Sequence, residues 1–410
     1  MLITNIKYLV NVRENNILLR GKNLAELPVL ENAFLKIKDN LIEDYGLMAE
    51  LNEEDFKQEI FDTKQATVMP SWCDSHTHLV YAASRENEFI DKIKGLSYAK
   101  IAAKGGGILN SAKRLNETSE EVLLELAQAK LNELIKLGTG AIEIKSGYGL
   151  SVDGELKMLR VIQQLKNQNN IPIKATFLGA HAFPEKFKQD RKSYIDLIIN
   201  DMLPQIANEH LADYIDVFCE KGFFTQYETE QICRAGIEHG LKPKIHANQL
   251  NISGGVQAGI NTNAVSVDHL ETIGENEIHL LSATNSPIAT LLPGCSFFLN
   301  MQYAPARTLI QHNTAIALAS DFNPGSSPSG NMNFVVSLAC TQMKMLPEEA
   351  INAATINGAF AMELQHKVGS ITKGKLANFI FTKPIPSIAY LPYSYGSNLI
   401  NQIMLNGNFI

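Results

Sequence analysis

Two histidines one residue apart, His76 and His78, lie in the segment DSHTHLVYAASREN at residues 74–87. In a β-strand, residues i and i+2 point to the same face, so both imidazoles could reach one metal ion. Asp74 would point to the same side, where a hydrogen bond at the strand end is as good an interpretation as direct contact with a metal. An ordinary hydrogen-bonded core or loop also accommodates two histidines, so the pair alone decides nothing.

Further histidines and one aspartate follow short apolar runs elsewhere in the chain. His181, His246 and His269 lie at or just after three such runs, and Asp321 follows another. The chain has ten histidines, so five of them at the ends of apolar runs indicate a shared site. Three histidines and a carboxylate with one open position are typical of catalytic zinc or iron sites. The expected ligands are His76, His78, His246 and Asp321.

Other side chains nearby suit an acidic substrate. Arg85 follows the histidine pair, and its planar guanidinium can bind a carboxylate through two hydrogen bonds, although an ion pair with a neighbouring glutamate is an equal alternative. Tyr148 lies between two glycines, which indicates a turn that presents the ring to the site. The polar segment at 321–330 offers backbone N–H groups to a carboxylate or amide, or is a simple turn. The glycines at 105–107 match no phosphate-binding pattern and favour a mobile lid or a close backbone approach.

Strands must position these residues, and the chain from residue 66 onward has the expected pattern. Short apolar runs alternate with segments typical of helices, such as residues 118–138, where Thr118 and Glu121 have capping-box spacing and Gly138 supplies an end. Eight alternations predict a parallel (β/α)8 TIM-like barrel of the α/β class, whose C-terminal strand ends form one functional rim. The expected strands are ATVMPSWCD, TGAIEIK, IKATFLG, DYIDVFC, KPKIHA, AVSVDHL, SPIATLLPG and AIALASD.

The two ends of the chain differ from this pattern. Residues 1–62 and 363–410 contain short strands with polar or glycine turns, and neither end is apolar enough for a core of its own. We therefore predict one small β-sandwich domain formed by both termini. Residues 63–362 are then expected to form the barrel of a metal-dependent hydrolase.

Composition limits the possible partners and location. In 410 residues, 45% are hydrophobic and 19% charged, which is ordinary for a globular protein, and the net charge of -7 argues against a nucleic-acid partner. The five cysteines form no C-x-x-C pair and indicate reduced thiols. No signal peptide or apolar run of ~20 residues predicts membrane insertion. We expect a cytoplasmic protein with a small-molecule substrate that carries a carboxylate; the oligomeric state stays open, with a homodimer as one alternative.

The motifs together resemble the amidohydrolase superfamily of metal-dependent hydrolases. Histidines after the first, fifth and sixth strands, an aspartate after the eighth and a small domain from both termini carry this resemblance. More narrowly, the sequence resembles the branch that hydrolyses 4-imidazolone-5-propanoate to N-formimidoyl-L-glutamate in histidine degradation. The stretches that carry the narrower resemblance are HTHLVYAASRENEF, KGGGIL, EIKSGYGL, FLGAHAFP, HANQL, SVDHLE and ASDFNPGSSP.

This resemblance implies one Zn²⁺ or Fe³⁺ ion, held by the four expected ligands, that activates water for attack on the cyclic amide carbonyl. It implies that His269, Asp321 and His181 are catalytic, with His269 or Asp321 taking the proton of the water. It also implies contacts with substrate or product. These contacts carry over to Arg85, Tyr148, His181, Gln249, Asn323, Gly325 and Ser326.

Some positions depart from the family pattern or leave alternatives open. Ser71 stands where a glycine is usual, and Asn378 replaces a common aspartate. Gln249 cannot act as a base, which excludes a mechanism that needs a carboxylate there. Lys145 could bridge two metal ions if carboxylated, or pair with a nearby acid. Another cyclic amidohydrolase, a deaminase and a metal-binding protein without catalysis are the rival functions; Arg85 argues against a neutral nucleobase, and the full ligand set argues against an inactive protein.

Overall fold

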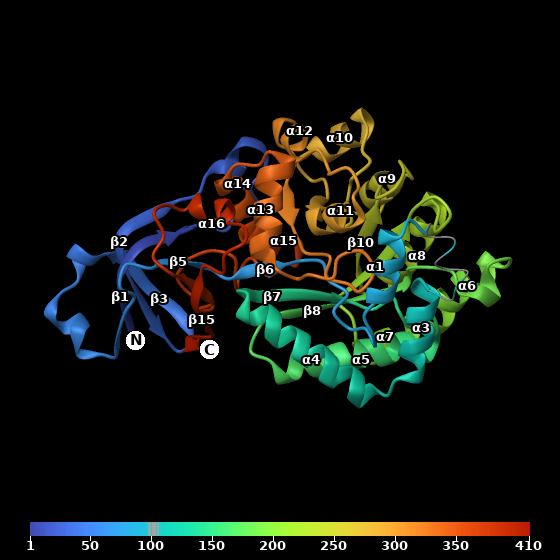
Figure 1. Cartoon of the computed structure of the whole chain (residues 1–410), viewed down its shortest axis with the longest axis horizontal. Helices are drawn as coiled ribbons and strands as arrows, with labels where there is room; N and C mark the ends of the chain where they lie inside the picture. Colours follow the sequence, from blue (N-terminus) through green and yellow to red (C-terminus); the bar gives the residue numbers. More distant parts are fainter. Residues whose placement is uncertain (97–99, 101–103, 105) are drawn as a thin grey trace.

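The structure is a computed structural model that describes residues 1–96, 100, 104 and 106–410. The glycine lid expected at 105–107 lies partly outside the described residues, because Gly105 is not among them. The described chain forms two sheets of eight strands each. A parallel sheet surrounded by helices makes up most of the molecule, and a mixed sheet lies at one end of it (Figure 1).

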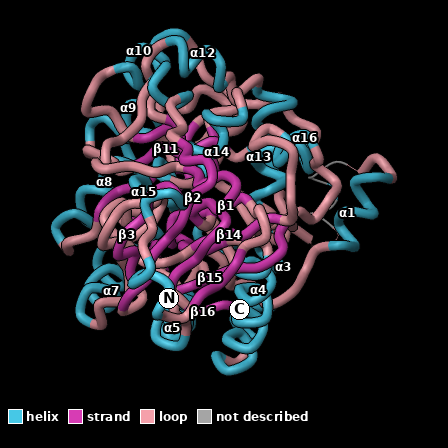
Figure 2. Tube along the Cα trace, turned by 90° about the vertical axis from the view of Figure 1, so that its left-hand side faces the viewer, coloured by secondary structure: helices cyan, strands magenta, loops and turns pink. Residues whose placement is uncertain are grey.

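The mixed sheet contains both ends of the chain, which Figure 2 shows face on. β1 lies between β5, to which it is parallel, and β2, to which it is antiparallel, while the C-terminal β14 pairs with the other edge of β5. Apolar side chains from both ends, among them Ile3, Leu9, Phe379 and Phe381, form one buried cluster. The predicted small β-domain of both termini is therefore confirmed. Its strands are β1 (Leu2–Val10), β2 (Val29–Lys38), β3 (Leu41–Leu47), β4 (Ile60–Asp62), β5 (Thr67–Pro70), β14 (Phe379–Thr382), β15 (Ile400–Leu405) and β16 (Asn408–Phe409).

The parallel sheet follows chain order from β6 to β13, and every neighbouring pair in it is parallel. This arrangement confirms the predicted (β/α)8 barrel, because a crossover joins each strand to the next. Most of the strand residues are fully buried, as expected for strands covered on both faces. The strands are β6 (Trp72–Asp74), β7 (Thr139–Lys145), β8 (Ile173–Ala180), β9 (Tyr214–Cys219), β10 (Lys242–Ala247), β11 (Ser266–His269), β12 (Ile288–Leu291) and β13 (Ile316–Leu318).

One sequence-based strand is wrong: the run ATVMPSWCD is divided between the two sheets. β5 belongs to the mixed sheet and β6 to the barrel, with Ser71 between them. The Ser71 N–H donates to the carbonyl of Asn378 at 3.0 Å, whereas the next N–H, of Trp72, donates to the carbonyl of Gly138 at 2.8 Å. Asn378 also bridges the sheets, because its Nδ2 donates to the Gly140 carbonyl. The chain thus changes hydrogen-bonding partners within one residue.

Helices cover the outside of the barrel and pack on its strands through one large apolar core (Figure 1). α4 illustrates how the sequence sets their ends: Ser119 caps it by accepting from the Val122 N–H, so Thr118 is not the cap, and Gly138 with φ +97° follows its end. None of the described helices is long and apolar enough to span a membrane. The longer helices are α1 (Glu86–Ile93), α3 (Ile108–Glu117), α4 (Glu120–Lys136), α5 (Val152–Gln168), α8 (Gln226–Glu238), α10 (Glu275–Ser282), α13 (Met332–Met343) and α14 (Pro347–Ala354). The shorter helices are α6 (Arg191–Leu197), α7 (Leu203–Asn208), α9 (Gly255–Asn261), α11 (Pro293–Leu299), α12 (Ala306–Gln311), α15 (Ile356–Ala361) and α16 (Tyr390–Tyr393).

Candidate active site and metal centre

The candidate site lies where the first and last barrel strands approach each other. Beyond β6 and β13, the Asp321 N–H donates to the His76 carbonyl at 3.0 Å, and the His78 N–H donates to the Phe322 carbonyl at 2.8 Å. On the other side, the Lys145 N–H donates to the Thr77 carbonyl at 2.8 Å. The backbone of three expected ligands is therefore fixed by the hydrogen bonds that close the barrel.

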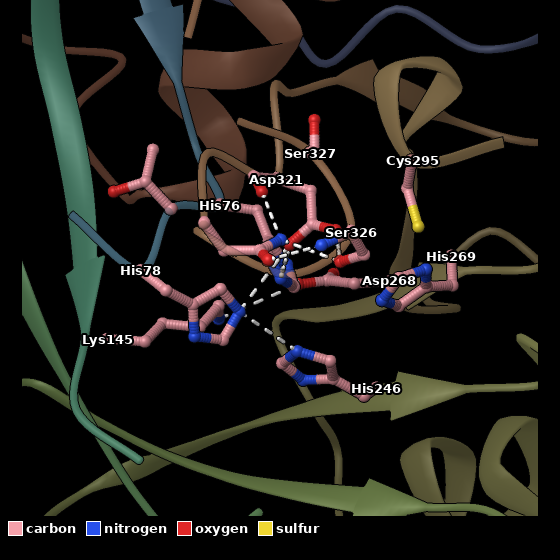
Figure 3. Close-up of polar contacts among 12 residues, drawn as sticks. His76, His78, Lys145, His246, Asp268, His269, Cys295, Asp321, Ser326 and Ser327 are labelled. Carbon is pink, nitrogen blue, oxygen red and sulfur yellow. Dashed lines mark hydrogen bonds and ion pairs between the residues drawn. The ribbon is translucent and has the colours of Figure 1, made fainter. Parts of the chain in front are cut away.

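The four expected metal ligands meet inside this rim (Figure 3). Asp321 Oδ1 lies 3.6 Å from His76 Nε2 and 3.5 Å from His78 Nε2, and the Nε2 atoms of His78 and His246 are 3.4 Å apart. All four side chains are buried. The residues that parallel strands bring to one rim are thus close enough to share one ion.

Two carboxylates behind the histidines set their orientation. Asp268 Oδ2 lies 2.6 Å from His76 Nδ1, and Asp216 Oδ2 lies 2.9 Å from His246 Nδ1. Each carboxylate accepts a hydrogen bond from the Nδ1–H group, which leaves a lone pair on Nε2 directed towards the other ligands. Asp74 has a different role, because its oxygens accept from the N–H and hydroxyl of Ser320 at 3.0 and 2.5 Å.

The residues present fit a metal ion. His76 Nε2 is buried without a hydrogen-bond partner, and the ligand atoms of His76, His78 and His246 all lie within 4.8 Å of one another. Lone pairs that converge at such distances repel each other unless a cation lies between them. Burial, followed by nearby positive groups, lowers the pKa of His76 and of His78 well below 6.5, so both imidazoles are neutral, as metal ligands must be.

His269 lies beside this group with a different environment. Its Nδ1 is 3.2 Å from Glu271 Oε1, and its ring is 5.3 Å from that of His246. Burial opposes its protonation, but the charge and hydrogen bond of Glu271 and the charge of Asp321 raise its pKa to about 9. Burial also raises the pKa of Asp321 to about 6, against the effect of His269. These two neighbours form a proton-carrying pair next to the candidate metal position.

The backbone is strained where these functional side chains start. His269 and Asp321 have φ of +88° and +53°, in the left-handed region that side chains rarely adopt. Asn248 and Leu270 share this conformation, with φ of +57° and +67°. Such strain concentrates at functional sites, where the surrounding structure enforces it. Here the strained residues lie at or shortly after the C-terminal ends of β10, β11 and β13, at the rim of the barrel.

A cavity of about 460 Å³ opens in front of the candidate metal position. Its volume and its mixture of apolar and polar walls suit a small organic molecule. All seven predicted substrate-contacting residues line it, and of the other predicted site residues only His76 does not. The lining residues among the predicted set are His78, Arg85, Tyr148, His181, His246, Gln249, His269, Asp321, Asn323, Gly325 and Ser326.

Arg85 is a half-buried cationic residue in this cavity without an acidic partner. Its Nε donates to Ser111 Oγ at 2.9 Å, whereas its Nη2 is buried with no hydrogen-bond partner. Within the described parts of the chain no carboxylate lies at ion-pair distance from Arg85, so the alternative pairing with Glu86 or Glu88 is not observed. An unpaired buried donor on a charged group needs a partner. A substrate carboxylate would supply it.

The loop after Asp321 is organised by Asn323. Its Oδ1 accepts from the N–H groups of Gly325 and Ser326, both at 2.8 Å, and its Nδ2 donates to the Asp321 carbonyl at 2.6 Å. Gly325 has no room for a side chain, because a Cβ there would lie 2.6 Å from Arg85 Nη1. The loop therefore lies next to the guanidinium, but the N–H groups of Gly325 and Ser326 are bound to Asn323 and are not free, as the prediction for the segment 321–330 had required.

His181 and Tyr148 form the wall opposite this loop. His181 stacks on His78 with ring centroids 5.3 Å apart, and its Nδ1 lies 3.0 Å from the Gly147 carbonyl. Burial lowers the pKa of His181 to about 3, so the ring is neutral and its Nε2 is left free for the cavity. The Tyr148 ring lies 5.6 Å from that of His181. Gln249 Nε2 instead donates to Cys295 Sγ at 3.3 Å.

Several residues of the site were not predicted. Asp216, Asp268 and Glu271 orient histidines, and Lys92 lines the cavity and donates to the Gly325 carbonyl at 3.2 Å. A signal was available for two of them, because DYIDVFC and AVSVDHL each place an acid inside an apolar strand. A charged residue in such a strand is buried and therefore paired. Lys145 is paired in this way, with Glu143 and Asp216 at 2.5 and 2.9 Å.

Comparison with known proteins agrees with this geometry. The family model "Amidohydrolase family" matches residues 67–410, and the chain belongs to this family of metal-dependent hydrolases. Solved structures with the same fold include E. coli guanine deaminase, at TM-score 0.74 and 13% identity over 100% of this chain and 99% of that one. An adenosine deaminase from Xanthomonas campestris gives TM-score 0.70 at 14% identity, over 100% of this chain and 92% of that chain. At these identities the likeness concerns the fold alone.

The curated relatives are much closer in sequence. The imidazolonepropionase of Flavobacterium johnsoniae is 57% identical over 100% of this chain and 99% of its own length. That of Christiangramia forsetii is 55% identical over 100% of both chains, and that of Alkaliphilus metalliredigens is 38% identical over 100% of this chain and 97% of its own. Within the amidohydrolases, the chain belongs with the imidazolonepropionases.

Proposed function

We propose that this chain hydrolyses 4-imidazolone-5-propanoate to N-formimidoyl-L-glutamate, a step of histidine degradation. The observation that carries the proposal is one cavity with a full set of metal ligands at its base and the unpaired Arg85 in its wall. The metal ligands suit hydrolysis of an amide, and the guanidinium suits the propionate group. The full-length relatives named imidazolonepropionase support the same activity.

The metal would be a single Zn²⁺ or Fe³⁺ ion held by His76, His78, His246 and Asp321. Nitrogen ligands with one carboxylate suit either ion. When bound, such an ion polarises a carbonyl and lowers the pKa of water from 15.7 towards about 7. The carboxylates that orient His76 and His246 support the choice of these four residues as the ligands.

The protein's own groups then position the substrate and move protons. Arg85 holds the propionate beside the loop that contains Gly325 and Ser326. Tyr148 and His181 enclose the ring, and because Nδ1 of the neutral His181 donates to the Gly147 carbonyl, its Nε2 can accept a hydrogen bond from a ring N–H of the substrate. These contacts fix the carbonyl carbon above the metal ligands, so that binding energy at the carboxylate orients the reacting bond.

Hydrolysis adds water across the ring C–N bond, so one proton must leave the water and one must reach the leaving nitrogen. We assign this transfer to His269, whose Nδ1 is supported by Glu271 and whose ring faces His246. His269 has a pKa of about 9 in the protein without an ion, and a cation held by Asp321 would offset one of the charges that raise this pKa. Asp321 is the alternative proton acceptor. Gln249 cannot take the proton, because its amide only donates or accepts hydrogen bonds.

The proposal is tested with purified protein of known metal content. Loss of imidazolone propionate is followed by absorbance, and formation of N-formimidoyl-glutamate is measured in parallel. We expect turnover that scales with the fraction of protein carrying one ion. Full metal occupancy without turnover of this substrate would refute the proposal and would leave another cyclic amide as the substrate class. Comparing the pH profiles of His269→Asn and Asp321→Asn proteins identifies which group takes the proton.

A deaminase function is less compatible with the cavity. A neutral nucleobase would leave the guanidinium of Arg85 unpaired and its Nη2 buried, which costs free energy.

We also propose that the protein is a cytoplasmic enzyme without nucleic-acid or membrane partners. This proposal fits a small acidic substrate, the net charge of -7 and the absence of a membrane-spanning helix among the described residues. Assembly as a homodimer is a further proposal, which the mass of the protein in solution tests.

A further inference from the structure

A layer of charged side chains lies inside the barrel directly beneath the metal ligands. It consists of Glu143 and Lys145 on β7, Asp216 on β9, Lys244 on β10 and Asp268 on β11. All five are buried, with at most 1% of their surface exposed. The interior of such a barrel is ordinarily filled by branched apolar side chains. Three carboxylates and two ammonium groups in this place therefore call for an explanation.

Stability does not provide that explanation. Removing charges from water costs several kcal/mol per ion, and the mutual attraction of a buried pair offsets this only when its geometry is good. Apolar residues of similar volume would stabilise the barrel as well or better. The charged layer is better explained by its effect on the metal ligands above it.

Lys145 contacts both carboxylates that orient metal ligands. Its Nζ lies 2.9 Å from Asp216 Oδ2, and this same oxygen is 2.9 Å from His246 Nδ1. Its Nζ also lies 3.7 Å from Asp268 Oδ2, the oxygen that is 2.6 Å from His76 Nδ1. One ammonium group on β7 thus joins the carboxylates that support ligands on two other parts of the barrel.

The charge of Lys145 also matters for these two supports. Burial acts to lower the pKa of Lys145, but Asp216, Glu143 and Asp268 raise it above its ordinary value, so the side chain is charged. Without this cation, Asp216 and Asp268 would face each other across a dry interior. Two like charges in that position repel and would pull away from the histidines that they hold.

We propose that Lys145 is a positioning residue for the metal site: by holding Asp216 and Asp268 together, it fixes the Nε2 atoms of His246 and His76 at the spacing the ion requires. This inference rests on the proposed metal site but not on the identity of the substrate. This role differs from that of a carboxylated lysine that bridges two metal ions, because the Nζ of Lys145 already forms ion pairs with Glu143 and Asp216.

Lys244 provides a matched control within the same layer. It is equally buried and also pairs with Glu143, but its other contacts are the carbonyls of Ser75 and Ala361, at 3.0 and 3.2 Å. Its charge acts on Asp268, as that of Lys145 also does, but it makes no hydrogen bond to either carboxylate that orients a ligand and does not join the two. Replacing either lysine with methionine removes one buried positive charge and keeps a side chain of similar length. The two variants therefore differ in which partners are lost.

The test is retention of Zn²⁺ against a chromogenic chelator, measured on the metal-loaded full chain alongside thermal unfolding. For Lys145→Met we expect Zn²⁺ to bind about tenfold more weakly than to the wild type, the lower end of what loss of an orienting partner costs. For Lys244→Met we expect Zn²⁺ affinity within about twofold of wild type, even if its unfolding temperature falls as much. Equal losses of affinity in both variants, or none in Lys145→Met, would overturn the proposal.

If Lys145→Met does not fold, the layer can be kept at its original net charge by combining it with Glu143→Gln. The pair Glu143→Gln/Lys145→Met and Glu143→Gln/Lys244→Met then replaces the single variants, with the same expected difference. Zn²⁺ affinity is measured without substrate, so a wild type that binds Zn²⁺ but does not turn over imidazolone propionate would refute the proposed function alone.

Discussion

Arg85 gives the sharpest test of the proposed substrate. Its Nε is occupied by Ser111 Oγ, while its Nη2 is buried without a partner, so one edge of the guanidinium is held ready for a carboxylate. Hydrogen bonds to charged groups contribute about 1.5–3 kcal/mol. We therefore expect Arg85→Met to lower kcat/KM for imidazolone propionate roughly 30- to 160-fold, which corresponds to a loss of about 2–3 kcal/mol of transition-state stabilisation.

The assay is loss of substrate absorbance, with metal content measured on each preparation. Arg85→Lys keeps the charge but not the planar fork, and we expect it to recover only part of the activity. Arg114, an exposed arginine on neighbouring α3, supplies the control: Arg114→Met should match the wild type. Each variant is also compared on the methyl ester of the substrate, which lacks the propionate charge.

The ester makes the reasoning refutable. Wild-type enzyme should lose kcat/KM on the ester by a factor similar to that caused by Arg85→Met on the acid. The Arg85→Met enzyme should treat acid and ester alike within about twofold, because the group that distinguishes them has gone. A variant that still prefers the acid as strongly as the wild type would show that another residue binds the propionate, and the cavity's Lys92 would be the first to test.

Three further predictions concern other parts of the structure. Gly147 has φ +108°, and a Cβ there would lie 2.9 Å from His181 Nδ1, so Gly147→Ala should lower the free energy of unfolding by about 1–3 kcal/mol and reduce kcat/KM. Gly374→Ala is the control: Gly374 has φ +84° and open space for a Cβ, so this variant should lose stability in urea unfolding but keep its turnover. Burial lowers the pKa of Lys375 from 10.5 to about 8. Between pH 8 and 10.5 the unfolded chain therefore binds more protons than the folded chain, and the free energy of unfolding rises with pH by up to about 1.4 kcal/mol per pH unit. Lys375→Met should lack this rise when urea unfolding is measured at pH 8, 9 and 10. Asp216→Asn should weaken Zn²⁺ binding about 10- to 100-fold in the chelator assay, and unchanged affinity would mean that this carboxylate does not support its histidine ligand.

The sequence predicted the barrel and the meeting of its polar residues because both depend on simple periodicity. Alternating strands and helices place successive strand ends at one rim, so His76, His246 and Asp321 converge although they are far apart in the chain. The same reasoning brought Arg85 and Tyr148 to the cavity. Their detailed partners could not be read this way, since the unpaired Nη2 of Arg85 depends on how a loop and a helix pack around it.

What the sequence did not predict depends on register and on single hydrogen bonds. The run ATVMPSWCD looks like one strand because its apolar residues continue across Ser71, yet backbone partners assign its halves to different sheets. Asp216 and Asp268 were not predicted, because which face of a strand points inward is known only after the strands pair. The choice of Ser119 over Thr118 as a cap is likewise a matter of one residue.

The backbone hydrogen bonds from Asp321 to His76 and from His78 to Phe322 tie completion of the metal site to completion of the fold. Three ligands are present in the chain long before the last strand, but the fourth arrives only when residues after β13 dock against those after β6. During synthesis, a chain that ends before Asp321 exposes histidines without the carboxylate that completes their set. If these four residues bind the ion as we propose, its tight binding requires that the first and last strands have met.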